Sequence, residues 1–287
     1  MNYQQLWRRL AAIYDEGEAK AIARMVFEVR YHLTLADILL GKDTQLSADC
    51  QEELEEIAQR LLRNEPVQYV LGEVEFCGRW FHVESGVLIP RPETEELCRF
   101  VLEESEKWRK MSECRILDVG TGSGCIAITL AAEMPHSIVT SWDVSTQALA
   151  IAQANARRIN VDIRCQQVDV LHLTSLTSHL SPLTSRFDII VSNPPYICHQ
   201  ERNAMESNVL DHEPALALFV PDDDPLLFYR AIAAMGLSAL REDGCLYFEI
   251  NPLYVDDLKE MLHAMSYRDI MVRNDQYGKQ RMMKAIR

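Results

Sequence analysis

Four consecutive residues, Asn193-Pro194-Pro195-Tyr196, have types and a spacing that could do chemistry. They follow the apolar run 187–192 (FDIIVS), which is typical of a buried strand. Open α/β sheets bind ligands beyond the carboxyl ends of their strands, and there the motif would place a side-chain amide on a stiff backbone. We interpret it as a holder of a planar nitrogen group. The alternative is a proline-rich turn that only ends a strand, because two prolines stop strand pairing.

A glycine-rich turn supplies a second candidate site at residues 118–124 (DVGTGSG). Glycines at 120, 122 and 124 let the backbone turn sharply and come close to a ligand, which predicts a nucleoside-type cofactor. The spacing is G-x-G-x-G and differs from the G-x-G-x-x-G of dinucleotide sites, so a cradled pyrophosphate is less well supported. The alternative is a turn that binds nothing.

Acidic residues end the next two predicted strands. Asp143 lies 19 residues after Gly124, where a carboxylate can accept both ribose hydroxyls and disfavours a 2′-phosphate. Asp169 ends the following strand, and with Val170 it could contact an adenine ring by a hydrogen bond and apolar packing. Each acid alone is more often a solvated turn residue. The coincidence of the glycine loop, both acids and Asn193 at four successive strand ends favours one binding site.

An α/β sheet would bring these strand ends together. From about residue 94, apolar strands alternate with helices, the pattern of a parallel sheet covered on both faces. We predict strands at 115–119, 138–142, 163–167, 187–191 and 245–250, and helices at 125–132, 146–158 and 226–240. Two further strands, 270–273 and 282–285, are joined by only about eight residues, so a hairpin with one reversed strand is expected there.

The residues before about 66 have helical periodicity. The apolar faces comprise Leu6, Leu10 and Ile13, then Ile22, Met25, Val26 and Val29, then Leu54, Ile57, Leu61 and Leu62. Ser47 can cap the last of these helices, and 64–66 (NEP) stops it. A β-hairpin is predicted from 74–76 and 80–83. The chain is therefore divided into a helical bundle for partner recognition (1–67), a β-hairpin linker (68–90) and a catalytic domain (91–287).

Composition limits the class of protein. With 287 residues and 48% hydrophobic content, the chain can build one large or two modest cores. It has no apolar run long enough for a membrane span, and residues 1–9 lack a signal peptide's apolar region, so a cytoplasmic protein is expected. The eight cysteines are scattered, which predicts reduced thiols and no metal site. A net charge of −14 argues against general nucleic-acid binding.

Further motifs extend over nearly the whole chain: 65–72 (EPVQYVLG) with 75–76 (EF), 88–95 (LIPRPETE), 193–197 (NPPYI), 213–216 (EPAL), 248–250 (FEI), and Asp275 with Gly278 and Arg281. With the glycine-rich turn and the acidic strand ends, the catalytic half resembles class I S-adenosylmethionine-dependent methyltransferases. On these motifs the whole chain resembles the HemK/PrmC family of protein-(glutamine-N5) methyltransferases, which modify peptide chain release factors and so tune translation termination. The sequence departs from the family pattern at Asn251, where the family usually has glycine, and at Val170, where an aromatic residue is often found.

The resemblance implies a Rossmann-like sheet with a reversed C-terminal strand, preceded by the helical bundle and the hairpin. It implies S-adenosylmethionine as cofactor and a class I release factor, presenting a glutamine on a Gly-Gly-Gln loop, as protein substrate. The cofactor would contact Gly120, Thr121, Gly122, Ser123, Gly124, Asp143, Asp169, Val170 and Asn193. The substrate glutamine would be held by Asn193, Pro194, Pro195 and Tyr196. A monomer is expected, without membrane contact, metal or sequence-specific nucleic-acid binding.

The chemistry explains these residue types. An amide nitrogen is a poor nucleophile because its lone pair is delocalised into the carbonyl. The Asn193 Oδ1 and the Pro194 carbonyl can accept its two N–H bonds and aim it at the methyl group for direct in-line displacement. Tyr196 would pack on the planar amide. We expect a surface or structural role for His199.

Two other residues near the domain junction are assigned structural roles. Arg91 could form an ion pair that seats the junction or could reach the cofactor, and of these the structural role is favoured. Thr94 is predicted to cap the following helix.

Three other classes of protein share some of these features. An amino-methyltransferase acting on adenine or cytosine would also use Asn-Pro-Pro-Tyr, but it should carry a basic surface and stacking partners for a flipped base. The acidic chain and its small helical domain favour a protein glutamine instead. A nucleotide-binding oxidoreductase has a different glycine spacing, and a non-enzymatic scaffold has no need of four aligned strand ends.

Overall fold

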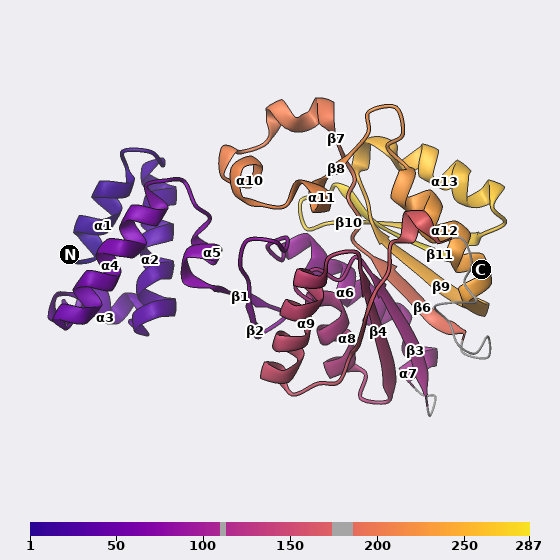
Figure 1. Ribbon diagram of the computed structural model, residues 1–287, viewed down its shortest axis with the longest axis horizontal. Helices are drawn as coiled ribbons and strands as arrows, with labels where there is room; N and C mark the ends of the chain where they lie inside the picture. The colour runs from indigo at the N-terminus through magenta and orange to yellow at the C-terminus, as the bar shows by residue number, and fades with distance from the viewer. Residues whose placement is uncertain (110–112, 174–185) are drawn as a thin grey trace. The chain divides into compact units, whose positions relative to one another are not determined.

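The computed structural model describes residues 1–109, 113–173 and 186–287. These residues form two units, shown in Figure 1. The smaller unit comprises Met1–Glu73, Val83–Ser85 and Glu206–His212, and the larger comprises Val74–His82, Gly86–Met205 and Glu213–Arg287. Within the described part of the chain, no helix has the length and apolar character to cross a membrane.

The smaller unit is helical. Its helices are α1 (Tyr3–Leu10), α2 (Glu16–Tyr31), α3 (Leu35–Leu39), the 3-10 helix η1 (Lys42–Gln45), α4 (Ala48–Leu61), α5 (Val67–Leu71) and α10 (Ser207–His212). The first four α-helices each begin at a side-chain cap, supplied by Asn2, Asp15, Thr34 and Ser47. The predicted Ser47 cap is confirmed, since its hydroxyl accepts from Cys50 N at 3.3 Å.

The buried face of α2 differs from the predicted one. Ala19, Ala23, Val26 and Phe27 are buried, whereas Met25 is 37% exposed. Ile13 is also exposed, because α1 ends at Leu10. The hydrophobic pattern favours the larger aliphatic side chains, but close helix packing uses the small alanines, and Ala19, Ala23 and Phe27 are all fully buried in the core of this unit.

The larger unit is built on a seven-stranded sheet in the order β10-β11-β9-β6-β3-β4-β5. The strands are β3 (Cys114–Val119), β4 (Ser137–Asp143), β5 (Arg164–Gln167), β6 (Phe187–Ser192), β9 (Leu240–Glu249), β10 (Arg268–Asn274) and β11 (Gln280–Ile286). Each predicted strand is present, and β11 is the one reversed strand, antiparallel to both β9 and β10. Strand β9 begins earlier than predicted, because Leu240 already pairs with Phe187 of β6.

Two hydrophobic cores cover the sheet, one on each face (Figure 1). Helices α6 (Pro92–Glu104), α8 (Cys125–Glu133) and α9 (Thr146–Ile159) contribute to one core, and α12 (Leu227–Ala239) and α13 (Val255–Ala264) to the other. Adjacent strand residues alternate between them: Ile116 and Ile189 face the first core, Leu117 and Ile190 the second. Because both faces of the sheet are covered by apolar cores, its central strands have uninterrupted runs of hydrophobic residues.

Short elements complete the larger unit. They are the hairpin β1 (Glu73–Phe76) and β2 (Arg79–His82), α7 (Glu106–Arg109), η2 (Val170–His172), β7 (Ile197–Cys198), η3 (His199–Ala204), α11 (Ala215–Leu218), β8 (Phe219–Val220) and η4 (Pro252–Tyr254). The buried side chain of Asn155 in α9 bonds both the N–H and the C=O of His82 in β2, and it also donates to the Ser123 carbonyl in the glycine loop. One side chain therefore fixes the hairpin and the glycine loop to α9.

Candidate active site

A pocket lies at the carboxyl ends of the central strands. Strand β3 has β4 on one side and β6 on the other, so the chain order reverses at this point of the sheet. Such a switch point opens a crevice between the loops that follow the two strands. The pocket is lined by Gly86, Val87, Leu88, Val119, Gly120, Gly122, Asp143, Val144, Ser145, Ala148, Val168, Asp169, Val170, Leu171, Ser192, Asn193, Pro194, Pro195, Pro214, Leu216, Ala217, Phe228 and Ile232.

Most residues predicted for the site line this single pocket. Gly120, Gly122, Asp143, Asp169, Val170, Asn193, Pro194 and Pro195 do so, although they come from four separate loops. Four predicted residues, Thr121, Ser123, Gly124 and Tyr196, do not line it. Conversely, no local sequence signal indicates the pocket walls at 86–88, at 216–217 or on α12, because these are mostly ordinary apolar residues brought in by tertiary packing.

The glycines of the loop have two different roles. Gly120 and Gly122 have φ of +76° and +53°, and no atom of the described residues lies within 4 Å of where a Cβ would be. Their faces are therefore open to a ligand. At Gly124 a Cβ would come within 2.9 Å of the Ile128 side chain and 3.0 Å of the Ala152 Cβ. The absence of a side chain at Gly124 thus allows α8 and α9 to pack closely.

The first of two acidic residues that contact the glycine loop is Asp118. Asp118 is fully buried and accepts a hydrogen bond from the Thr121 hydroxyl at 2.7 Å. Burial raises the pKa of Asp118 to about 7, and the nearby charge of Asp143 acts in the same direction. Thr121 therefore stabilises the loop from within by its hydrogen bond to Asp118. The Asp118 carboxyl is partly protonated near neutral pH.

Asp143 faces the pocket with both carboxylate oxygens already ordered. Its Oδ2 accepts from Gly122 N and its Oδ1 from Ser145 N, each at 2.9 Å. Burial raises the pKa of Asp143, whereas these backbone N–H groups lower it. Each oxygen retains a second lone pair that can accept from a pair of hydroxyls.

Asp169 is more exposed than Asp143. Its Oδ1 accepts from Leu171 N at 2.9 Å, which caps η2, and its Oδ2 lies 2.7 Å from His172 Nδ1. Val170 beside it lines the pocket and packs against the second core. The pair thus presents one polar and one apolar surface at the end of β5.

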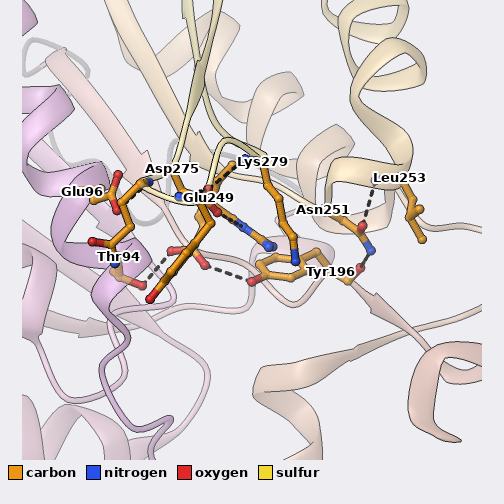
Figure 2. Close-up of polar contacts among 11 residues, drawn as sticks. Thr94, Glu96, Tyr196, Glu249, Asn251, Leu253, Asp275 and Lys279 are labelled. Atoms are coloured by element: carbon orange, nitrogen blue, oxygen red, sulfur yellow. Dashed lines mark hydrogen bonds and ion pairs between the residues drawn. The ribbon is translucent and has the colours of Figure 1, made fainter. Parts of the chain in front are cut away.

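Asn193 belongs to a hydrogen-bond network that joins three distant segments. Its Nδ2 donates to the Thr94 hydroxyl at 3.1 Å. The Thr94 hydroxyl in turn donates to Glu249 Oε2 at 2.7 Å, and the Tyr196 hydroxyl donates to Glu249 Oε1 at 2.9 Å. Figure 2 shows the Glu249 carboxylate between Thr94 and Tyr196. Tyr196 does not line the pocket, but its bond to Glu249 connects it to the same network as Asn193.

The role predicted for Thr94 is wrong. Arg91 occupies the N-cap position of α6, and Thr94 is three residues further along, in the first turn. The hydroxyl of Thr94 serves Glu249 and Asn193 instead of the helix end. Spacing could not reveal this, because the two partners lie 155 and 99 residues away in sequence.

Arg91 forms an ion pair with Glu213, whose side chain is 1% exposed. The other Glu213 oxygen accepts from Ile89 N at 3.1 Å. Two of the motifs singled out in the sequence, 88–95 and 213–216, are therefore connected, and the second continues into the pocket wall at Pro214 and Leu216. His199 is exposed and stacks on Phe219, with ring centroids 5.2 Å apart, which fits the structural role expected for it.

The end of β9 and the β10–β11 turn complete the surroundings of Glu249. The Asn251 Nδ2 donates to the Tyr196 carbonyl at 3.1 Å. Asp275 orders its turn by accepting from Tyr277 N and Lys279 N, each at 2.9 Å, and lies 3.6 Å from Arg281 Nε. Burial raises the pKa of Glu249, while the hydrogen bonds from Thr94 and Tyr196 and the charge of Arg281 oppose that rise.

Comparison with known proteins connects both units to one group of enzymes. Residues 3–72 match the family model of the PrmC N-terminal domain, and residues 99–214 match that of the Methyltransferase small domain. The chain is 46% identical over 278 residues to the Release factor glutamine methyltransferase of Bacteroides thetaiotaomicron, covering 97% of this chain and 96% of that protein. It is 40% identical over 285 residues to the enzyme of the same name from Flavobacterium psychrophilum, covering 99% and 98%.

Solved structures show the same fold at low sequence identity. The catalytic domain of human Mettl16, solved with an RNA hairpin, superposes with a TM-score of 0.54 at 18% identity, covering 72% of this chain and 74% of that one. A methyltransferase from Pyrococcus furiosus superposes with a TM-score of 0.50 at 15% identity, covering 79% and 96%. These likenesses confirm the predicted class I methyltransferase fold.

The buried carboxyl of Asp118 should make stability depend on pH. The folded protein keeps this proton up to a pKa of about 7, whereas the unfolded chain loses it near the ordinary value of 3.8. The stabilising contribution is complete below pH 4 and is lost as the pH rises through 7. Asp118→Asn has no proton to lose, so its unfolding free energy relative to wild type should rise by roughly 2 to 3 kcal/mol between pH 5 and pH 8.

Urea unfolding at the two pH values measures this difference. The exposed Asp162, changed to Asn, is the control and should show no comparable trend. A constant difference between Asp118→Asn and wild type across this range would show that Asp118 is already ionised in the folded protein at pH 5.

Proposed function

This chain belongs to the release factor glutamine methyltransferase family, and we propose that it transfers a methyl group from S-adenosylmethionine to the side-chain amide nitrogen of a glutamine in a peptide chain release factor. The observation that carries the proposal is the placement of Asn193 in one pocket with Gly120, Gly122 and Asp143. Asn193, which could bind a planar amide, therefore lines the same pocket as the glycine loop and Asp143, which could bind a nucleoside. A substrate that acts in translation implies a cytoplasmic enzyme.

The residues present fit S-adenosylmethionine. The open faces of Gly120 and Gly122 leave room for a ligand to approach the backbone. Asp143 would accept from the ribose hydroxyls with its remaining lone pairs, and Asp169 with Val170 would hold the adenine. Of the residues first assigned to the cofactor, Thr121, Ser123 and Gly124 would act indirectly by shaping the loop, since they do not line the pocket.

Asn193 and Pro194 would prepare the substrate nitrogen. When bound, the cofactor supplies an electrophilic methyl group on a sulfonium. Because Asn193 directs its Nδ2 at Thr94, its Oδ1 is available to accept one N–H of the glutamine amide. The Pro194 carbonyl would accept the second, since proline has no N–H but keeps its C=O. Two acceptors orient the nitrogen and stabilise the positive charge that develops on it during transfer.

Tyr196 does not line the pocket, so it would serve the amide indirectly, by holding the end of the motif in place. Burial raises the pKa of Tyr196, and the adjacent charge of Glu249 raises it further, so the phenol stays protonated. Its hydroxyl donates to Glu249 and its carbonyl accepts from Asn251, and these two bonds fix the position of the residue. No residue is assigned as general base, and the amide proton would leave to water after methylation.

Methylation of a nucleic-acid base is the less supported alternative. One structural neighbour was solved with an RNA hairpin, but at 18% identity that likeness extends to the fold alone. The chain carries a net charge of −14, which opposes capture of a phosphate backbone. The relatives that match nearly the full chain are named for release factors.

The proposed reaction can be tested with labelled S-adenosylmethionine and a release factor. We expect label on the protein substrate and its loss when the glutamine of the Gly-Gly-Gln loop is changed to alanine. Mass spectrometry of the peptide should place the methyl group on that side chain. Label that persists on the alanine variant, or that appears only on added RNA or DNA, would contradict the proposal.

Asn193→Ala should lower kcat on the release factor by on the order of 100-fold, because it removes a preorganised acceptor for the reacting nitrogen. Cofactor affinity should survive in large part, since Asp143 and the glycine loop remain. Steady-state kinetics and calorimetry separate the two quantities. An equal loss of cofactor affinity and of turnover would mean that Asn193 mainly serves the cofactor.

Gly120→Ala should weaken S-adenosylmethionine binding by about tenfold or more, because the added methyl group enters the space through which the ligand reaches the backbone. Gly78→Ala is a matched control: Gly78 has a similar φ of +70° and the same open space around a built Cβ, but it lies in the hairpin turn. Both substitutions should lower stability by about 1 to 2 kcal/mol. Calorimetric Kd values that change equally in both variants would remove Gly120 from the cofactor site.

A further inference from the structure

Glu249 is a buried carboxylate to which the proposed reaction gives no direct role. It ends strand β9 and is 1% exposed. Each of its oxygens accepts from a hydroxyl, Oε2 from Thr94 and Oε1 from Tyr196 (Figure 2). Both hydroxyls donate to Glu249 when it is ionised, and these two bonds together with the charge of Arg281 favour the ionised form against the effect of burial. Keeping such a group out of water is unfavourable unless both partners are held in place.

The Thr94 hydroxyl has one proton, and this determines its other contact. With that proton donated to Glu249, the Thr94 oxygen can only accept from a further partner. The partner is the Asn193 side chain, which has an NH2 donor on one arm of its amide and an oxygen acceptor on the other. Thr94 therefore binds the NH2 group of the Asn193 amide, and the Asn193 Oδ1 remains available to a ligand in the pocket.

We propose that Glu249 and Thr94 are positioning residues that set which end of the Asn193 amide faces the substrate, an inference that rests on the proposed methyl transfer. The two arms of an amide have nearly the same shape, so the walls of a pocket distinguish them poorly. A relay of hydrogen bonds with a fixed direction does distinguish them. A reversed Asn193 would point its N–H groups at the N–H groups of the substrate amide.

The same strand end also fixes Tyr196, the last residue of the motif. Glu249 holds the Tyr196 hydroxyl, and Asn251, two residues further on, holds the Tyr196 carbonyl at 3.1 Å. The Oδ1 of Asn251 also accepts from Leu253 N at 3.0 Å. The end of β9 thus positions the motif at both Asn193 and Tyr196.

The test compares Thr94→Val with Thr94→Ser in the full-length protein, assayed with S-adenosylmethionine and a release factor. Valine keeps the shape of threonine but has no hydroxyl, and serine keeps the hydroxyl. We expect Thr94→Val to lower kcat by about tenfold or more, with KM for the release factor and Kd for S-adenosylmethionine within about twofold of wild type. Thr94→Ser should retain kcat within about threefold.

Thr129→Val is the matched control, because Thr129 is equally buried, lies in α8 and does not line the pocket. It should leave kcat within about twofold, as expected for a buried hydroxyl outside the relay. A Thr94→Val enzyme with wild-type kcat would overturn the proposal. So would a Thr94→Ser enzyme as slow as Thr94→Val, since the hydroxyl would then not be the group that matters.

A second pair of variants tests the direction of the relay. Glu249→Gln offers one acceptor and one donor in place of two acceptors, so one of the two hydroxyls must accept from the amide NH2 instead of donating. Where that hydroxyl is Thr94 the relay is reversed, and kcat should fall by about twofold or more. In an Asn193→Ala background, Thr94→Val should change the residual rate by less than about twofold, because Thr94 acts through Asn193. A further large loss in that background would contradict the relay. Wild-type protein that methylates no glutamine would instead refute the proposed function itself.

Discussion

The buried carboxylate of Glu249 is the constraint on which the geometry of the site depends. A carboxylate removed from water requires hydrogen-bond donors, and here they come from the first turn of α6 and from the loop after β6. These donors lie 155 and 53 residues away in sequence, so satisfying one side chain brings three segments to one point. Because the two donors must approach opposite oxygens, the loop that carries Asn193 has little freedom.

The sheet supplies the frame in which that carboxylate lies. Two apolar cores require strict alternation along each strand, and this alternation fixes the direction in which every strand end leaves the sheet. Asp143 ends β4, Asn193 follows β6 and Glu249 ends β9, all at carboxyl ends of parallel strands. The polar residues therefore gather at one edge of the sheet, where the carboxyl ends of the neighbouring strands β6 and β9 lie side by side.

The strands and the main helices could be predicted from sequence because their signals are local, and eight of the twelve residues predicted for the site line the pocket. Apolar runs with glycine or aspartate at their ends specify β3 and β4 within a residue or two. The roles of Thr94, Asn155 and Gly124 could not be predicted, since each depends on a partner brought near only by folding. The buried face of α2 was missed because alanines carry little hydrophobic signal yet pack most closely.

The relay from Glu249 through Thr94 also bears on the strength of the acceptor that Asn193 presents. A charged acceptor polarises the Thr94 O–H, which makes the Thr94 oxygen a better acceptor for the Asn193 NH2. Drawing that NH2 outward favours the amide resonance form with more negative charge on Oδ1. During methyl transfer, positive charge develops on the nitrogen that Oδ1 would hold, and a preorganised negative oxygen stabilises it without reorganisation. A buried carboxylate one hydrogen bond removed from the pocket can thus act on the reacting nitrogen while the pocket surface itself remains a neutral amide.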